Sequence, residues 1–130
     1  MSAPRVVVLG GGPAGNVAAF RAAQLGASVT MIERDNVGGT CLNWGCIPTK
    51  ALLAATEVLR KAREAEKWGL VIPEVGVDFP RMMERKDEIV STLRSQVEGV
   101  AGAKNVEVIY DTGRVEGDVV VVGEQEYPYD

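Results

Sequence analysis

Two cysteines form the most reactive pattern in the sequence. Cys41 and Cys46 flank the start of a predicted helix and are the only cysteines in the chain. A helix N-terminus favours the thiolate over the thiol, because unpaired N–H groups and the helix dipole stabilise negative charge. Lys50 lies one helical turn after Cys46 and adds positive charge on the same face. The spacing therefore favours a redox-active dithiol.

Two other uses of the cysteine pair stay open on the residues alone. A structural disulfide across so short a loop contributes about 2 kcal/mol, the low end for disulfides, and belongs to oxidising compartments. A zinc site requires about four ligands. The sequence has no second cysteine pair and no histidine to supply them.

A glycine-rich segment has the spacing of a dinucleotide-binding loop. The residues Gly10-Gly11-Gly12-Pro13-Ala14-Gly15 match G-x-G-x-x-G between a predicted strand and a predicted helix. In this pattern Gly10 allows a tight turn, Gly12 lets the backbone approach a pyrophosphate, and Gly15 lets the helix pack closely. The pyrophosphate then lies at the helix N-terminus.

Glu33 ends the next predicted strand. An acidic side chain at that place accepts hydrogen bonds from a ribose diol. The alternative is a plain glycine turn with a solvated surface glutamate. Because strand, glycines, helix, strand and acid occur in order, we expect a bound dinucleotide, and the motif fits FAD and NAD equally.

A βαβ unit is needed to position these groups. A buried strand is expected at 5–9, a helix at 14–25 stopped by Gly26, and a second strand at 27–33. A polar, glycine-rich loop is expected at 34–43.

Apolar residues at helical spacing predict two long helices. The first covers 47–67, with Pro48 in its first turn, and a connector follows at 70–77. The second begins at an Asp78 N-cap and ends near Gly102, with most of its apolar positions expected in the core.

Short strands are expected after the second helix, at 106–110, 114–116 and 119–122, with turns at Gly113 and 117–118. The predicted fold class is α/β. It consists of a Rossmann-like parallel sheet, a long helical pair and a small β-meander.

Composition narrows the classes of function. The 130 residues are 46% hydrophobic and 25% charged, with a net charge of −4 and a pI of about 4.9. An acidic chain has no electrostatic footprint for nucleic acid or an anionic membrane, and no apolar stretch is long enough to span a bilayer. A cytoplasmic protein is expected. Without histidine, an imidazole acid–base must come from elsewhere.

The cysteine segment also resembles a family signature. The run Gly38-Gly39-Thr40-Cys41-Leu42-Asn43-Trp44-Gly45-Cys46-Ile47-Pro48-Thr49-Lys50 is similar to the redox motif of the pyridine-nucleotide–disulfide oxidoreductases. The resemblance is specific over 5–53, and beyond that only the order of elements agrees. It implies that residues 1–130 are an incomplete N-terminal FAD-binding domain, without the NAD-binding and dimerisation domains of a full-length homodimer. This chain alone is expected to be inactive.

The resemblance implies roles for individual residues. Cys46 would lie against the flavin, Cys41 would exchange with the substrate dithiol, and Glu33 would bind the adenosine ribose. The other positions implied to line FAD are Gly10, Gly12, Ala14, Gly15, Arg34, Gly38, Gly39, Thr40, Lys50 and Gly113. Two residues depart from the family pattern. Asp111 stands where glycine is expected, and the bulky Trp44 would shield the disulfide.

The family's chemistry implies the partner. The motif is most similar to the branch in which a lipoyl-bearing protein donates electrons through Cys41 and Cys46 to FAD and then to NAD. The alternatives are a mercuric or glutathione-type reductase acting on mercuric ion or a small disulfide, and a non-catalytic nucleotide-binding fragment.

Overall fold

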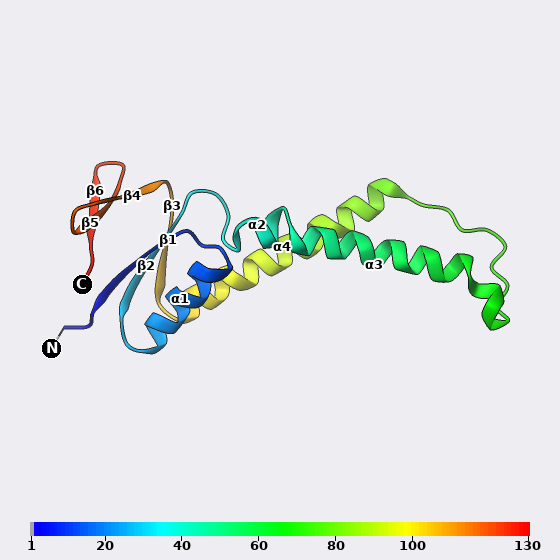
Figure 1. Cartoon of the computed structure of the whole chain (residues 1–130), viewed down its shortest axis with the longest axis horizontal. Helices are drawn as coiled ribbons and strands as arrows, with labels where there is room; N and C mark the ends of the chain where they lie inside the picture. The colour runs from blue at the N-terminus through cyan, green and yellow to red at the C-terminus, as the bar shows by residue number, and fades with distance from the viewer. Residues whose placement is uncertain (1) are drawn as a thin grey trace.

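A parallel sheet of three strands forms the centre of the computed structural model, which describes residues 2–130 (Figure 1). Its order is β1 (Arg5–Leu9), β2 (Ser28–Glu33) and β3 (Val106–Tyr110). β2 pairs with both neighbours, which explains why four of its six residues are buried. The predicted βαβ unit is confirmed, and the strand at 106–110 joins it as the third member.

Helices cover one face of the parallel sheet. α1 (Pro13–Gln24) and the end of α4 (Phe79–Ala103) pack there through Ala19 and Ala101, which are almost fully buried. Their small side chains let both helices approach Met31 of β2 closely. α1 ends where Gly26 adopts a φ of +92°, as predicted.

A small antiparallel sheet covers the other face. It contains β4 (Gly113–Glu116), β5 (Val119–Val122) and β6 (Gln125–Pro128) in sequence order. Val120 and Val122 pack against Ile32 of β2 and form a second core cluster. The meander was predicted, but its last strand was not.

Gly113 is the first residue of β4, so the turn expected at this position is wrong. A Cβ atom at Gly113 would lie 2.7 Å from Leu9 Cδ2 and 3.2 Å from Ile32 Cγ2. Glycine is therefore needed here because the two sheets approach each other closely.

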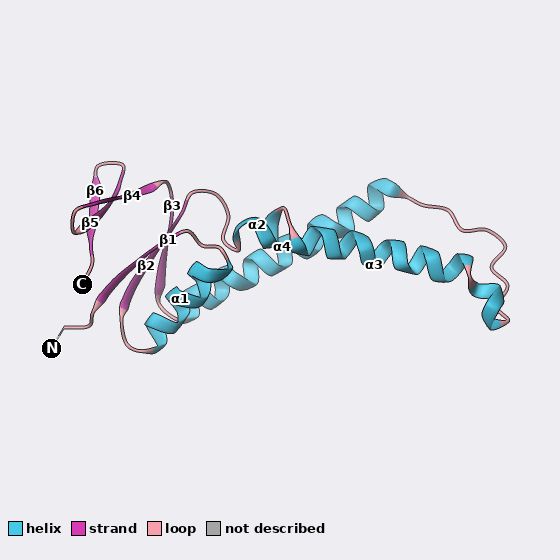
Figure 2. Cartoon of the chain, viewed as in Figure 1, coloured by secondary structure: helices cyan, strands magenta, loops and turns pink. Residues whose placement is uncertain are grey.

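A helical arm projects from this layered body (Figures 1 and 2). It consists of α3 (Cys46–Arg63), a 3₁₀ turn η1 (Ala65–Trp68) and the first part of α4, joined by the coil at 70–77. α3 has no buried residue, and α4 buries only Val90 and Ala101. The expectation that most apolar positions of the second helix lie in the core is wrong, because most of α4 extends beyond the sheet.

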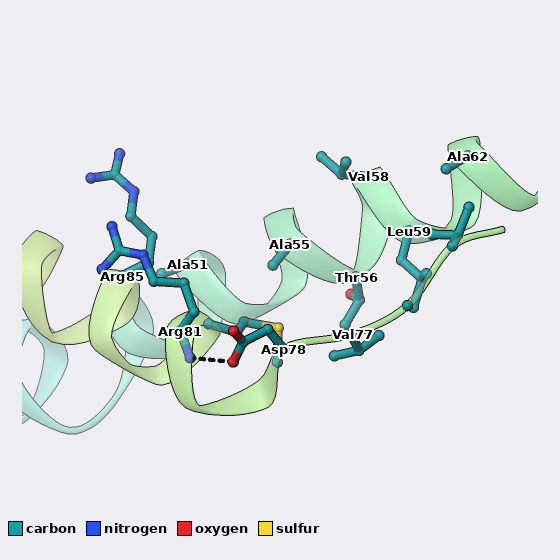
Figure 3. Close-up of a pocket in the computed structure, with 13 residues that line it drawn as sticks. Ala51, Ala55, Thr56, Val58, Leu59, Ala62, Val77, Asp78, Arg81 and Arg85 are labelled. Atoms are coloured by element: carbon teal, nitrogen blue, oxygen red, sulfur yellow. Dashed lines mark hydrogen bonds between the residues drawn. The ribbon is translucent and has the colours of Figure 1, made fainter. Parts of the chain in front are cut away.

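The ends of the arm helices differ in part from the prediction. α3 stops at Arg63 rather than Lys67, because Glu64 leaves helical geometry and the chain tightens into η1. α4 begins as predicted, with the Asp78 carboxylate accepting a hydrogen bond from the Arg81 backbone N–H at 3.0 Å. Figure 3 shows this cap beside a cavity of about 410 Å³ between α3 and the start of α4. None of the predicted site residues lines that cavity.

The segment expected as a loop at 34–43 contains a short helix, α2 (Gly39–Asn43). Its N-cap, Gly38, has a φ of +93°, a conformation that glycine adopts without strain. Among residues 2–130, no helix combines the length and apolar character needed to cross a membrane.

Candidate functional site

The glycine loop connects β1 to α1 in the predicted geometry. Gly10 turns the chain with a φ of +94°, and its N–H donates to the Ile32 carbonyl at 2.8 Å. A Cβ atom on Gly15 would lie 1.8 Å from the Gly10 carbonyl oxygen. The turn at Gly10 and the close packing at Gly15 are thus confirmed.

Gly12 differs from these two glycines. Its backbone is extended, and a Cβ atom there would meet only Gly39 Cα at 3.9 Å. Neither backbone conformation nor protein packing therefore requires glycine at this position. Gly12 lies at the N-terminus of α1, which no side chain of residues 2–130 caps. The uncapped backbone N–H groups at this helix N-terminus are suited to bind a pyrophosphate.

Glu33 is buried, with 8% of its surface exposed, so the alternative of a solvated surface glutamate is wrong. Its Oε2 accepts a hydrogen bond from the Gly11 N–H at 2.7 Å, and its Oε1 accepts one from the Asp35 N–H at 2.9 Å. Each oxygen keeps a second lone pair that can accept from a ligand hydroxyl. The carboxylate thus fixes the glycine loop, a role that the sequence did not indicate.

A small polar cavity opens beside Glu33. Its volume is about 220 Å³. Gly10, Glu33, Arg34 and Gly113, which are predicted cofactor residues, lie in its wall together with Asp111, which departs from the family pattern. The other lining residues are Leu9, Ile32 and Thr112. The size and the donors and acceptors of this cavity fit the polar part of a nucleoside.

The second loop of the site packs directly on the first. The Gly38 N–H donates to the Gly11 carbonyl at 2.6 Å, and a Cβ atom on Gly39 would lie 2.8 Å from Gly12 Cα. Ala14, in the first turn of α1, and Thr40, in α2, are both exposed at this junction. The structure therefore brings the glycine loop and the segment that leads to the cysteines into contact.

The two cysteines face each other across a tight turn. Cys41 lies in α2, and Cys46 is the first residue of α3. Gly45 lies between the two helices, where a Cβ atom would be 3.0 Å from the Thr40 carbonyl. Both side chains are free thiols, with Cys41 half-buried and Cys46 exposed.

Their contact sets the protonation of Cys41. A hydrogen bond with the Cys46 side chain, together with burial, raises the pKa of the Cys41 thiol, and the charge of Lys50 opposes this rise only weakly. The backbone N–H of Cys46, at the α3 N-terminus, also lowers the pKa of Cys41, but it does not outweigh the causes that raise it. Among residues 2–130, no group of three or more metal-ligating side chains occurs.

Cys41 opens onto a cavity of about 370 Å³ between α1, α2, α3 and α4. Its walls are mainly apolar, including Phe20, Leu42, Leu93 and Val97. The polar side chains in the lining are Asn16, Gln96 and Cys41 itself. An uncharged, largely aliphatic disulfide matches this lining better than a highly charged one.

Asn43 and Arg94 belong to the site although sequence reasoning gave them no role. Asn43 is 8% exposed and its Nδ2 donates to the carbonyls of Asn36, Val37 and Gly39 at 3.0–3.3 Å. Its Oδ1 accepts a hydrogen bond from Arg94 Nε of α4 at 2.9 Å. Only the position of Asn43 between the two cysteines could have indicated its importance. Trp44, expected to shield the cysteines, has 58% of its surface exposed.

Comparison with known proteins gives relatives for nearly the whole chain. The family model described as "Pyridine nucleotide-disulphide oxidoreductase" matches residues 4–130. A dihydrolipoyl dehydrogenase of Zymomonas mobilis is 44% identical over 113 residues, which are 87% of this chain and 24% of the relative. One from Bacillus subtilis is 44% identical over 112 residues, which are 86% of this chain and 24% of the relative. Dihydrolipoyl dehydrogenase 2 of Haloarcula marismortui is 46% identical over 116 residues, which are 89% of this chain and 24% of the relative.

Solved structures show the same fold. LpdA from Mycobacterium tuberculosis matches with a TM-score of 0.82 and 22% identity, over 98% of this chain and 30% of that one. The HOCl-induced flavoprotein disulfide reductase RclA from Escherichia coli matches with a TM-score of 0.72 and 30% identity, over 95% and 26%. The chain thus spans about a quarter of the length of the curated relatives it matches.

Proposed function

The chain belongs to the pyridine nucleotide-disulphide oxidoreductase family, and we propose that it is the FAD-binding, dithiol-bearing part of a dihydrolipoamide dehydrogenase. The observation that carries this proposal is the contact between the two loops. A glycine loop suited to a pyrophosphate touches the segment that bears a pair of facing thiols. The relatives named dihydrolipoyl dehydrogenase support this branch of the family.

FAD is the dinucleotide that we propose for this site. Gly10, Gly12, Ala14 and Gly15 would hold its pyrophosphate, Glu33 its adenosine ribose, and the cavity beside Glu33 would receive the nucleoside. Further contacts are assigned to Arg34, Gly38, Gly39, Thr40, Lys50 and Gly113. When bound, FAD accepts the electron pair that the dithiol delivers, and NAD is the proposed final acceptor in the full-length enzyme.

The chain's own cysteines would carry the exchange with substrate. Starting from the Cys41–Cys46 disulfide, a substrate thiolate attacks Cys41 Sγ, and the S–S bond breaks with Cys46 leaving as the thiolate. The second substrate thiolate then displaces Cys41 Sγ, which closes the substrate disulfide and leaves both cysteines reduced. Two electrons thus move from the substrate dithiol to the cysteine pair, and the two substrate protons pass to bases or solvent. Cys46 is the thiolate assigned to the flavin face.

The proposed substrate is a dihydrolipoyl group on a carrier protein. The full-length enzyme is proposed to be a homodimer in the cytoplasm. The mainly apolar cavity at Cys41 supports an aliphatic dithiol over the charged glutathione disulfide. A mercuric or glutathione-type reductase is the alternative in the same family.

Exchange with small dithiols tests this assignment. The oxidised chain is incubated with dihydrolipoamide, or with the polar dithiol dithiothreitol at the same thiol concentration, and new protein thiols are alkylated and mapped. We expect two alkylated cysteines, Cys41 and Cys46, to appear at least about tenfold faster with dihydrolipoamide. Equal rates with both reductants would contradict the lipoyl assignment, and no gain of thiols would contradict the dithiol function itself.

A further inference from the structure

We propose that Arg94 is a positioning residue for the cysteine pair, acting through Asn43. This inference rests on the proposed dithiol function and names a residue outside the family motif. Arg94 lies in the middle of α4, whereas the cysteines lie in α2 and α3, so the contact joins segments 51 residues apart.

The Asn43 side chain ties the helix that bears Cys41 to the loop that precedes it. Three backbone carbonyls of the 36–39 segment already use its Nδ2 donor. Its remaining polar atom, Oδ1, accepts a partly buried hydrogen bond from Arg94 Nε at 2.9 Å. Both the donor and the acceptor of the Asn43 amide therefore hold one geometry, and among the hydrogen bonds of residues 2–130 Arg94 is the only partner of the Asn43 side chain from outside the 36–39 segment.

The position of Asn43 makes this geometry relevant to the thiols. It stands between Cys41 and Cys46 in sequence, and its carbonyl partners lie in the loop that touches Gly12. Without the Arg94 donor, Asn43 Oδ1 loses the one partner shown for it inside a residue that is 8% exposed, so this segment must admit water or reorient. The two sulfur atoms would then spend less time in contact, which lowers their effective concentration toward each other.

Disulfide formation measures that effective concentration directly. In a glutathione redox buffer, the two cysteine thiols reduce one glutathione disulfide, and the products are the Cys41–Cys46 disulfide and two reduced glutathiones. The electron pair and both protons pass to glutathione. The equilibrium constant of this reaction rises as the two thiols are held closer together.

Substitutions at Arg94 separate the hydrogen bond from the charge. Gln Nε2 is attached to Cδ, as Arg Nε is, so Arg94→Gln keeps the donor and removes the charge. Arg94→Met removes both, and Arg94→Lys keeps the charge without a donor at this atom. The matched control is Arg85→Met on the same helix, where the side chain is exposed and pairs with Glu88.

The equilibrium constant with glutathione should fall about threefold or more for Arg94→Met and Arg94→Lys. It should stay within about twofold of the wild type for Arg94→Gln and Arg85→Met. If Arg94→Met fails to fold, Arg94→Lys against Arg94→Gln decides the same question. Equal constants for Lys, Gln and wild type would overturn the role of Arg94 while leaving the dithiol function intact. A wild-type chain that forms no disulfide in this buffer would overturn both.

Discussion

At the scale of single residues, buried polar side chains build the site by holding loops. Glu33 and Asn43 are both 8% exposed, and both use their polar atoms on backbone groups of the two loops. An unpaired buried polar group costs about 1–3 kcal/mol, so these residues define the loop geometry strongly. The proposed ligand binding and dithiol chemistry would therefore depend on side chains that hold the two loops in place.

Replacing Glu33 by alanine should weaken FAD binding. The substitution leaves the Gly11 N–H without its acceptor and the ribose hydroxyls without theirs, at a cost of about 1–3 kcal/mol. The dissociation constant for FAD, measured by fluorescence titration, should rise roughly tenfold or more.

Glu124→Ala serves as the control for this measurement, because Glu124 is exposed in the turn between β5 and β6. Its dissociation constant should match that of the wild type. A Glu33→Ala variant with unchanged FAD affinity would remove Glu33 from the binding site.

The Cys41 thiol should react faster with alkylating reagents as the pH rises. Because hydrogen bonding to Cys46 and burial raise the pKa of the Cys41 thiol, little of it is thiolate near neutral pH. The rate of alkylation at Cys41, followed by peptide mapping, should keep rising at pH values above the ordinary thiol pKa of about 8.5.

Cys46→Ser removes the neighbouring thiol and is expected to move the Cys41 profile toward lower pH, with faster alkylation at neutral pH. A Cys41 profile already at its plateau near neutral pH in the wild type would contradict the raised pKa.

At the scale of elements, local sequence signals predicted the βαβ unit well. The strand, the glycine turn, the helix with its Gly26 stop and the next strand each carry their own signal within a few residues. α2 has no such signal, because a five-residue helix among glycines and polar residues depends on tertiary contacts. The Asn43–Arg94 bond was equally inaccessible, since nothing local indicates which residue of α4 faces the turn.

A substitution at Gly15 tests how closely α1 approaches the glycine loop, and a substitution at Gly102 in α4 is its control. Gly15→Ala would place Cβ 1.8 Å from the Gly10 carbonyl oxygen, so α1 must shift, at a cost of about 1–3 kcal/mol. Gly102→Ala, in α4, meets no atom within 4 Å and should stabilise the helix by up to about 1 kcal/mol.

Urea unfolding followed by circular dichroism measures both changes. The expected result is a lower midpoint for Gly15→Ala and an equal or higher one for Gly102→Ala. Equal midpoints for the Gly15→Ala variant and the wild type would show that the loop and α1 are not in close contact.

At the scale of the whole molecule, the arm is the least covered part of the chain. Trp68, in η1, is 81% exposed, and Val71, in the coil at 70–77, is 87% exposed. Figure 1 shows η1 and this coil at the end of the arm that is farthest from the sheets. The amphipathic pattern of α3 and α4 was read correctly, but a pattern alone does not show which element covers an apolar face. Burial of that face needs other polypeptide, either another copy or further chain.

We therefore expect the 130-residue chain to self-associate. Sedimentation velocity should show a weight-average mass that rises with protein concentration. Trp68→Glu with Val71→Glu should reduce this rise, because the charges oppose burial of the arm. Val17→Glu, on the exposed side of α1, is the control and should leave it unchanged. A wild-type chain that stays monomeric at all concentrations would contradict this expectation.

The central claim is that Cys41 and Cys46 form one reversible redox pair. Intact mass spectrometry of the chain, equilibrated first with oxidised lipoamide and then with dihydrolipoamide, tests it most directly. The account predicts a loss of two hydrogen masses on oxidation, a single crosslinked peptide joining Cys41 to Cys46, and full return on reduction. Two thiols that stay reduced, or that pair between chains instead of with each other, would contradict it.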